Sequence, residues 1–187
     1  MPYVLCFTVM NPITRSVGAL DTPVDPALTA HEGRDAYLAE NGFSLAAYDD
    51  AWVQLSFFSL SFTVPNPPSR RRAVRLHDLH HVATGYGTDL VGEAEVSAWE
   101  LRGGLKGLGL YPSLLVLTAL GIGLVLSPKR TWTAWQRAAG ARSLFNEQLP
   151  YEKLLAMRVG ALRERLHVVT AGQATHARGL HPLAPKN

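Results

Sequence analysis

The chain has 187 residues, 47% of them hydrophobic and 18% charged, which is typical of one globular domain with a sizeable core. The charged share lies below the average of about 25%, which indicates a lipid-facing or membrane-proximal protein. Most lysines and arginines follow residue 68, either as ordinary surface or as contacts for anionic headgroups. They lack interleaved stacking aromatics, so we expect no nucleic acid, and the single Cys6 excludes an internal disulfide.

The first part of the chain is predicted to be an irregular arm over residues 1–25, followed by a helix. No basic residue precedes the apolar start, which argues against a secretory signal. Asp25 can cap a helix over Pro26–Glu40, with the proline at its first position, and Asn41-Gly42 ends that helix.

A second helix is predicted over Ser44–Ser61. Four large apolar residues recur there at helical spacing and are expected in the core: Trp52, Leu55, Phe58 and Phe62. A proline-rich break at residues 65–68 then leads into Arg70-Arg71-Arg72. This basic run lies at the wrong end of the next helix for the macrodipole, which favours a solvated face or a headgroup contact.

The stretch from Arg70 to Arg102 holds the residues with the clearest chemistry. A helix over Arg70–Ala83 places His77 and His81 four residues apart on one face, a spacing that can grip a divalent metal. Asp78 lies beside them, as a further ligand or as a partner that fixes a histidine tautomer.

Glu93 is the predicted carboxylate ligand of this site. Gly85-Tyr86-Gly87 ends the first helix, and Thr88 or Asp89 can cap a second helix, from about Leu90 to Arg102. A short loop makes the two helices antiparallel neighbours, so Glu93 should face the histidines. Two histidines and one carboxylate leave coordination positions open, as in catalytic sites.

The expected ion is Zn²⁺, with Mg²⁺, Fe²⁺ and Mn²⁺ as alternatives. Such an ion can act as a Lewis acid on a carboxylate, phenolate or carbonyl oxygen. His80 and Glu100 are candidate groups for moving a proton, and either can equally be a surface residue. His77-Asp78 is also the dyad of HD-type phosphohydrolases. That alternative is weak, because it needs a later aspartate and none follows Asp89.

Residues 107–127 contain no charged side chain. By length they could span a bilayer, although Pro112, Gly121 and Gly123 interrupt them. A helix that is buried or lines an apolar groove is the favoured interpretation, ahead of interfacial insertion and of spanning.

The remaining chain is predicted to hold a helix over Thr131–Arg142, a last helix from Pro150 to about Val169, and a disordered tail over residues 172–187. Trp132 beside several arginines suits a membrane interface or an ordinary amphipathic helix. No strand is predicted. The fold class is therefore all-α, a single domain over residues 26–171 with six or seven helices.

The His77-Asp78-x-x-His81 motif, with Glu93 after eleven further residues, resembles the signature of the Coq4 family of ubiquinone-biosynthesis proteins. The residues that flank this motif, Arg75-Leu76 and Thr84–Asp89, also resemble those of the family. The resemblance runs more loosely from about Asp25 to Leu166.

This resemblance implies a helical protein at the cytoplasmic side of the inner membrane, peripheral to it, which holds an isoprenoid lipid. It implies metal-dependent oxidative decarboxylation of a polyprenylated hydroxybenzoate-type ring, together with organisation of the other ubiquinone-biosynthesis proteins; a homodimer is compatible with it. A non-enzymatic isoprenoid-binding scaffold with a structural metal is the alternative. The residues expected to hold the polyprenyl tail are Leu108, Leu110, Leu114, Leu115, Leu117, Leu120, Ile122 and Leu124.

Overall fold

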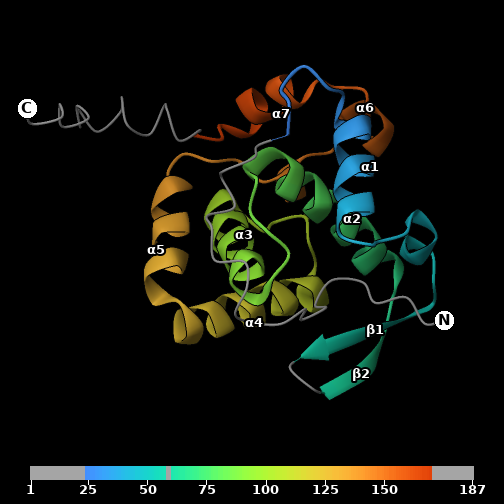
Figure 1. Cartoon of the computed structure of the whole chain (residues 1–187), viewed down its shortest axis with the longest axis vertical. Helices are drawn as coiled ribbons and strands as arrows, with labels where there is room; N and C mark the ends of the chain where they lie inside the picture. The colour runs from blue at the N-terminus through green and yellow to red at the C-terminus, as the bar shows by residue number, and fades with distance from the viewer. Residues whose placement is uncertain (1–23, 58–59, 170–187) are drawn as a thin grey trace, which may run out of the picture.

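The computed structural model describes residues 24–57 and 60–169, so the predicted arm and tail lie almost wholly outside the described residues. The described part is mostly helical, with seven α-helices and one two-stranded hairpin (Figure 1), which confirms the predicted all-α class. In chain order the elements are α1 (Ala30–Glu40), η1 (Leu45–Tyr48), β1 (Trp52–Phe57), β2 (Leu60–Pro65), α2 (Pro68–Thr84), α3 (Leu90–Gly103), α4 (Leu110–Leu126), α5 (Pro128–Arg137), η2 (Leu144–Asn146), α6 (Tyr151–Leu155) and α7 (Val159–Leu166).

Helix α1 begins later than its sequence predicts. Thr29, not Asp25, is the N-cap, and Thr29 and Glu32 form a reciprocal capping box. The Asp25 side chain instead accepts a hydrogen bond from the amide of Ala27 in the preceding turn. The predicted boundary at Pro26 is therefore wrong by one helical turn.

The helix predicted over Ser44–Ser61 is also wrong. After the short η1 the chain forms an antiparallel hairpin, with Trp52 paired to Pro65 and Val53 to Val64. Apolar and polar residues alternate along both strands, as in Val-Gln-Leu-Ser-Phe and Leu-Ser-Phe-Thr-Val, and this period of two is the pattern of a strand. Trp52 was expected in the core, but it is 64% exposed. The side chains of residues 55–62 lie outside the described residues.

Helices α2 and α3 follow one another through a short loop and contact each other. Gly85 caps the C-terminus of α2, and its left-handed φ of 77° suits a residue without Cβ. The predicted cap of the second helix is confirmed, because the Asp89 carboxylate accepts hydrogen bonds from the amides of Val91 and Gly92. A Cβ on Gly92 would lie 2.2 Å from the carbonyl oxygen of Gly87, so this loop closes tightly and fixes the relative register of the two helices.

Helix α3 is the centre of the fold. It packs against α4 and α5 (Figure 1), and its residues from Gly92 to Glu100 are all buried. Val96, Ala98 and Trp99 belong to the main core cluster, to which α2, α5 and α7 also contribute. Three glutamates lie in this buried run: Glu93, Glu95 and Glu100. A buried charge is unfavourable unless it is paired, so each of them needs a partner.

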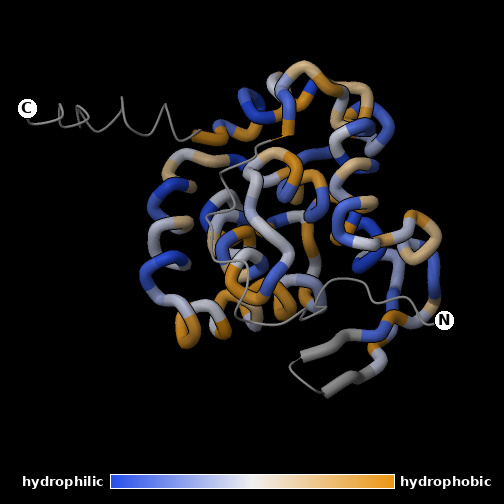
Figure 2. Tube along the Cα trace, in the orientation of Figure 1, coloured by the Kyte–Doolittle hydropathy of each residue, from blue (hydrophilic) through white to orange (hydrophobic). Residues whose placement is uncertain are grey.

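Helix α4 is buried on one face only. Its buried residues, Pro112, Val116, Ala119 and Gly123, follow helical spacing, while Leu110 and Val125 are about four-fifths exposed. Figure 2 shows its apolar run along the edge of the molecule. Of the favoured alternatives, a buried helix is therefore wrong, whereas a helix that lines an apolar groove agrees with the structure, because Pro112, Leu115 and Ala119 line one. Among residues 24–57 and 60–169, none of the helices combines the length and hydropathy needed to cross a bilayer.

The last predicted helix is divided into α6 and α7. The amide of Ala30 donates to the carbonyl of Met157, and the amide of Val159 donates to the carbonyl of Leu28. This short backbone pairing with the segment before α1 replaces the helical hydrogen bonds at that point. The break follows from a partner more than a hundred residues away in the sequence, which local spacing does not show.

The close contact between α3 and α4 depends on Gly123, which gives the first prediction. A Cβ there would lie 2.1 Å from the Cβ of Ala94 and 2.7 Å from Oγ1 of Thr131. Gly123→Ala should lower the free energy of unfolding by about 1–3 kcal/mol through overpacking, measured by urea denaturation. Gly121→Ala is the matched control, because a Cβ there meets nothing within 4 Å. It should be neutral or stabilise by up to about 1 kcal/mol; equal effects would contradict the packing argument.

Candidate metal centre

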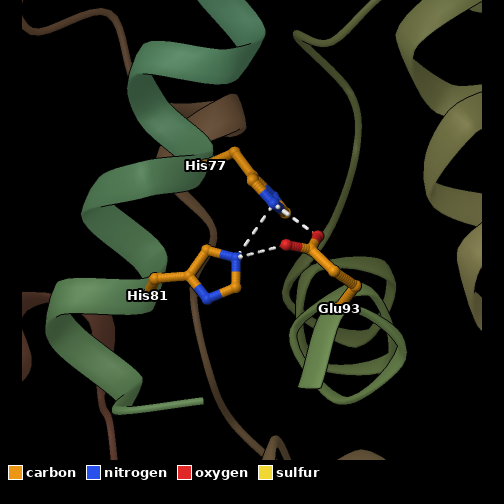
Figure 3. A group of neighbouring side chains, drawn as sticks. All are labelled: His77, His81 and Glu93. Carbon is orange, nitrogen blue, oxygen red and sulfur yellow. Dashed lines mark hydrogen bonds and ion pairs between the residues drawn. The ribbon is translucent and has the colours of Figure 1, made fainter. Parts of the chain in front are cut away.

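His77, His81 and Glu93 come together between α2 and α3, as the sequence predicts (Figure 3). The two Nε2 atoms lie 3.0 Å apart. Glu93 places Oε2 at 3.2 Å from Nε2 of His77 and Oε1 at 3.5 Å from Nε2 of His81. Two nitrogens bound tetrahedrally to zinc at 2.0–2.1 Å would be about 3.3 Å apart. The group is therefore close to the dimensions of a metal site, and it could hold a metal ion.

The outer nitrogen of each histidine is held by a hydrogen-bond acceptor. Nδ1 of His81 lies 2.8 Å from the carbonyl oxygen of Tyr86, and Nδ1 of His77 lies 2.7 Å from Oε1 of Glu100. A carbonyl can only accept, so Nδ1 of His81 carries the proton and its Nε2 presents a lone pair. The Glu100 carboxylate favours the same tautomer in His77. Hydrogen bonds of this kind orient metal-binding histidines and raise their basicity.

The arrangement is unfavourable for neutral imidazoles with nothing between them. Two nitrogen lone pairs that face one another at 3.0 Å repel, and the Glu93 carboxylate adds a negative charge at the same point. A cation at this point, either a proton on one Nε2 or a metal ion, relieves the repulsion and compensates the carboxylate charge. The chemistry of the donor set therefore fits a divalent ion.

Both carboxylates of the site are held ionised. Burial alone would raise the pKa of Glu93, but the adjacent His81 and His77 rings hold it well below its usual range. Burial likewise opposes ionisation of Glu100, yet the charge and hydrogen bonds of His77, and then those of His80, lower its pKa to about 2. Oε2 of Glu100 is buried and has no hydrogen-bond partner within the described part of the chain. A nearby positive ion would reduce the cost of burying that oxygen.

Asp78 is not brought into this group. Its carboxylate instead accepts a hydrogen bond from the hydroxyl of Tyr48, in η1. Burial raises the pKa of Asp78 to about 6, against the lowering influence of His77 and Tyr48. Of the four predicted ligands, the structure gathers three and places the fourth with Tyr48.

His80 lies in the core, not at the site surface. Its Nδ1 lies 2.7 Å from Oε1 of Glu100, and its Nε2 accepts a hydrogen bond from the amide of Leu144. The side chain is fully buried, and burial lowers its pKa. Both nitrogens are thus occupied, and this position supports a role in holding Glu100 and not the predicted role in moving a proton.

Sequence reasoning found Glu100 but missed what it does. Its position, seven residues after Glu93 and two turns along the same helix, indicated that it faces α2. The partners Tyr86 and Leu144 act through backbone atoms, which no side-chain pattern reports. Tyr37, which stacks on the His81 ring at 5.3 Å between centroids, comes from α1 and was missed too.

A narrow, mostly apolar groove of about 60 Å³ opens beside the group, between α2, α3 and α4. Its lining residues are Arg70, Ala73, Val74, His77, Glu93, Ser97, Leu108, Pro112, Leu115, Val116, Ala119 and Phe145. His77 and Glu93 are therefore reachable from an apolar space.

The residues expected to hold a lipid tail divide between the two faces of this segment. Leu108 and Leu115 line the groove. Leu120 packs against the core and Ile122 is half-buried. The other four lie on the exposed face of α4, away from the groove lining: Leu110, Leu114, Leu117 and Leu124.

Metal content should depend on the three ligands and on Glu100, which gives a second prediction. His81→Ala and Glu93→Ala should abolish stoichiometric binding of Zn²⁺ or Co²⁺, measured by elemental analysis and titration. Glu100→Gln should weaken binding about 10–100-fold, as loss of a supporting carboxylate does at other metal sites. Glu95→Gln is the control, because Glu95 lies on the same helix but pairs with Arg130. Full metal content in Glu93→Ala would show that the ligand set is wrong.

The third prediction concerns how the free energy of unfolding of the metal-free protein depends on pH. The folded-state pKa of Glu100, about 2, lies below its ordinary value of 4.5. Its contribution to stability is therefore present above pH 4.5 and is lost as the pH falls toward 2, because only the unfolded chain binds the proton there. Asp78 acts in the opposite direction between pH 6 and 3.8, because burial raises its pKa.

The change in the free energy of unfolding per pH unit can be measured by urea denaturation at a series of pH values. Glu100→Gln should flatten the dependence between pH 4.5 and 2 by up to about 1.4 kcal/mol per pH unit, the amount for one proton. A wild-type slope in this variant would contradict the assignment of an ionised Glu100.

No family model, no curated protein and no solved structure matches this chain. The resemblance to the Coq4 family therefore stays a prediction, carried by the motif from His77 to Glu93.

Proposed function

We propose that this protein binds a divalent metal through His77, His81 and Glu93 and acts on the polar head of an isoprenoid-tailed aromatic acid. One observation carries the proposal: the histidine and carboxylate group borders an apolar groove, so one molecule can meet the metal and an apolar wall together. The Coq4-like motif supplies the substrate class, a polyprenylated hydroxybenzoate-type ring. The reaction is then loss of the ring carboxylate as CO₂. Its oxidative form adds a hydroxyl group at that carbon and requires an added oxidant.

The chain's own residues would bind and orient the substrate. Two imidazoles and one carboxylate leave coordination positions for a substrate oxygen, and the bound ion would supply Lewis-acid polarisation of that oxygen. Glu100 and the Tyr86 carbonyl hold the two rings in place, so the ligands need not reorganise. Arg70 lies in the groove lining and is buried. Its positive charge favours an acidic head group over a neutral one.

The outer face of α4 would hold the protein against a lipid surface. Leu110, Leu114 and Val125 are exposed there, and Trp132 in the middle of α5 is 56% exposed. Exposed apolar residues beside a tryptophan are typical of a membrane interface. This placement suits a long apolar tail, which could pass from the membrane toward the groove.

A non-enzymatic isoprenoid-binding scaffold is the second candidate. The observation in its favour is the small groove volume of about 60 Å³, which is too narrow for an aromatic ring unless α4 shifts. In that case the metal would stabilise the α2–α3 pair and the groove would hold only part of an isoprenoid chain.

The fourth prediction separates these functions. Protein purified in mild detergent should carry near-stoichiometric metal and an isoprenoid mass by elemental analysis and native mass spectrometry. Supplied with a polyprenylated hydroxybenzoic acid and an oxidant, it should release CO₂, and metal-stripped protein should not. Retained lipid and metal without CO₂ release would favour the scaffold. A folded protein with neither would contradict both functions.

Leu115 and Leu117 provide a matched pair for the groove. Leu115 lines it, whereas Leu117 lies on the exposed face of the same helix. Leu115→Asn should lower the amount of bound isoprenoid several-fold, and Leu117→Asn should leave it unchanged. Equal loss in both variants would indicate a general effect of α4 and not a lipid site in the groove.

A further inference from the structure

A second cavity, of about 440 Å³, lies against another face of α2 and shares no lining residue with the groove beside the metal centre. Its lining residues are Asp49, Pro68, Arg71, Arg72, Arg75, Leu76, Gln148, Leu149, Pro150 and Tyr151. Three arginines thus border one cavity, with Asp49 as the only carboxylate in that lining. The cavity is large enough for a small anion with its attached group.

Arg72 forms part of the cavity wall, because its guanidinium is hydrogen-bonded to two other segments. Its guanidinium donates to the carbonyl oxygens of Gly107 at 3.0 Å and Glu147 at 3.2 Å. These bonds tie α2 to the segments before α4 and after η2. The positive charge of Arg72 remains beside the cavity, because carbonyl groups accept hydrogen bonds without neutralising it.

Arg71 and Arg75 present donors to the cavity. They lie four residues apart, on one face of α2. Nε of Arg71 donates to the carbonyl oxygen of Asn66, and within the described part of the chain its two terminal nitrogens make no hydrogen bond. Arg75 pairs through one terminal nitrogen with Asp49 at 2.8 Å, and Asp49 is 67% exposed. An exposed pair of this kind adds little stability and can exchange for a better anion.

The surroundings favour a multiply charged anion. Like charges in one cavity repel, so three guanidinium groups against one exposed carboxylate are stabilised by a ligand that brings more than one negative charge. Guanidinium groups match phosphate oxygens in pairs, through two parallel hydrogen bonds. The hydroxyl of Tyr151, which accepts from Arg34 at 3.4 Å, has its own proton to donate. This accounts for the basic run at the start of α2, which the helix macrodipole does not favour.

We infer that this cavity is a phosphate-binding site, in which Arg71 and Arg75 hold a phosphomonoester or diphosphate group and Arg72 fixes the wall. The group can come from a soluble compound or from a phospholipid headgroup, since the recognised chemistry is the same. The site stands apart from the proposed function, because none of its residues binds the metal or lines the groove.

Calorimetric titration of the full chain with inorganic pyrophosphate tests the inference. Arg71→Gln/Arg75→Gln should weaken binding at least tenfold. The matched control, Lys129→Gln/Arg142→Gln, removes the same charge outside the cavity and should stay within about twofold of wild type. Asp49→Asn should strengthen binding about threefold, because it removes the competing carboxylate. Equal losses in both double variants, or no gain in Asp49→Asn, would overturn the inference.

A second arm distinguishes the two sources of phosphate. Sedimentation with phosphatidylcholine vesicles, with and without phosphatidic acid, is compared for wild type and Arg71→Gln/Arg75→Gln. Binding that needs phosphatidic acid and both arginines supports the site with a headgroup as its ligand; pyrophosphate binding alone supports it with a soluble ligand. If neither probe binds through the arginines, the inference is wrong. Metal content, measured in the same samples, should be unchanged, so the outcome is independent of the metal centre.

Discussion

The buried carboxylate of Glu100 is the constraint on which the rest of this structure depends. It comes from α3 and meets two imidazoles of α2, with Oε1 at 2.7 Å from Nδ1 of both His77 and His80. A fully buried carboxylate is strongly unfavourable unless it is paired and hydrogen-bonded. The register in which α2 and α3 pack is therefore the one that gives the Glu100 carboxylate its hydrogen bonds, because other registers would leave a buried charge without partners. The same register brings Glu93 opposite His77 and His81.

His80 extends this constraint to a third segment. Its second nitrogen accepts a hydrogen bond from the amide of Leu144, in η2, so one imidazole connects α3 to a turn more than forty residues later. Phe145 packs edge-on against the same ring, at 4.9 Å between centroids, and also lines the groove. The polar network and the groove wall are thus parts of one arrangement. The residues that support the candidate metal centre are therefore themselves core residues.

The sequence predicts the parts of the candidate site whose positions depend on the spacing of nearby residues. Four-residue spacing predicts the histidine pair, and the short loop with its Asp89 cap predicts that Glu93 lies opposite. Spacing was uninformative where the partner is distant or is a backbone atom, as for Leu144 and for the Met157 carbonyl that divides the last helix. The hairpin is a different case. Apolar and polar residues alternate along its strands, so the sequence does contain the pattern of a strand, and the prediction of a helix there was wrong.

Helix α2 separates two cavities of different chemistry, and a series of contacts runs between them. Arg75 lies over the ring of Tyr48 at 5.6 Å, and Tyr48 donates to Asp78, the residue after His77. Contact alone is not coupling, which needs an element with two alternative arrangements. Tyr48 and Asp78 are almost fully buried and bonded to one another, so they form a fixed wall and not a switch. An anion that draws Arg75 away from Asp49 would replace a contact at an exposed carboxylate and leave this wall in place. One helix can therefore carry a metal centre on one face and an anion site on another, each with its own ligand.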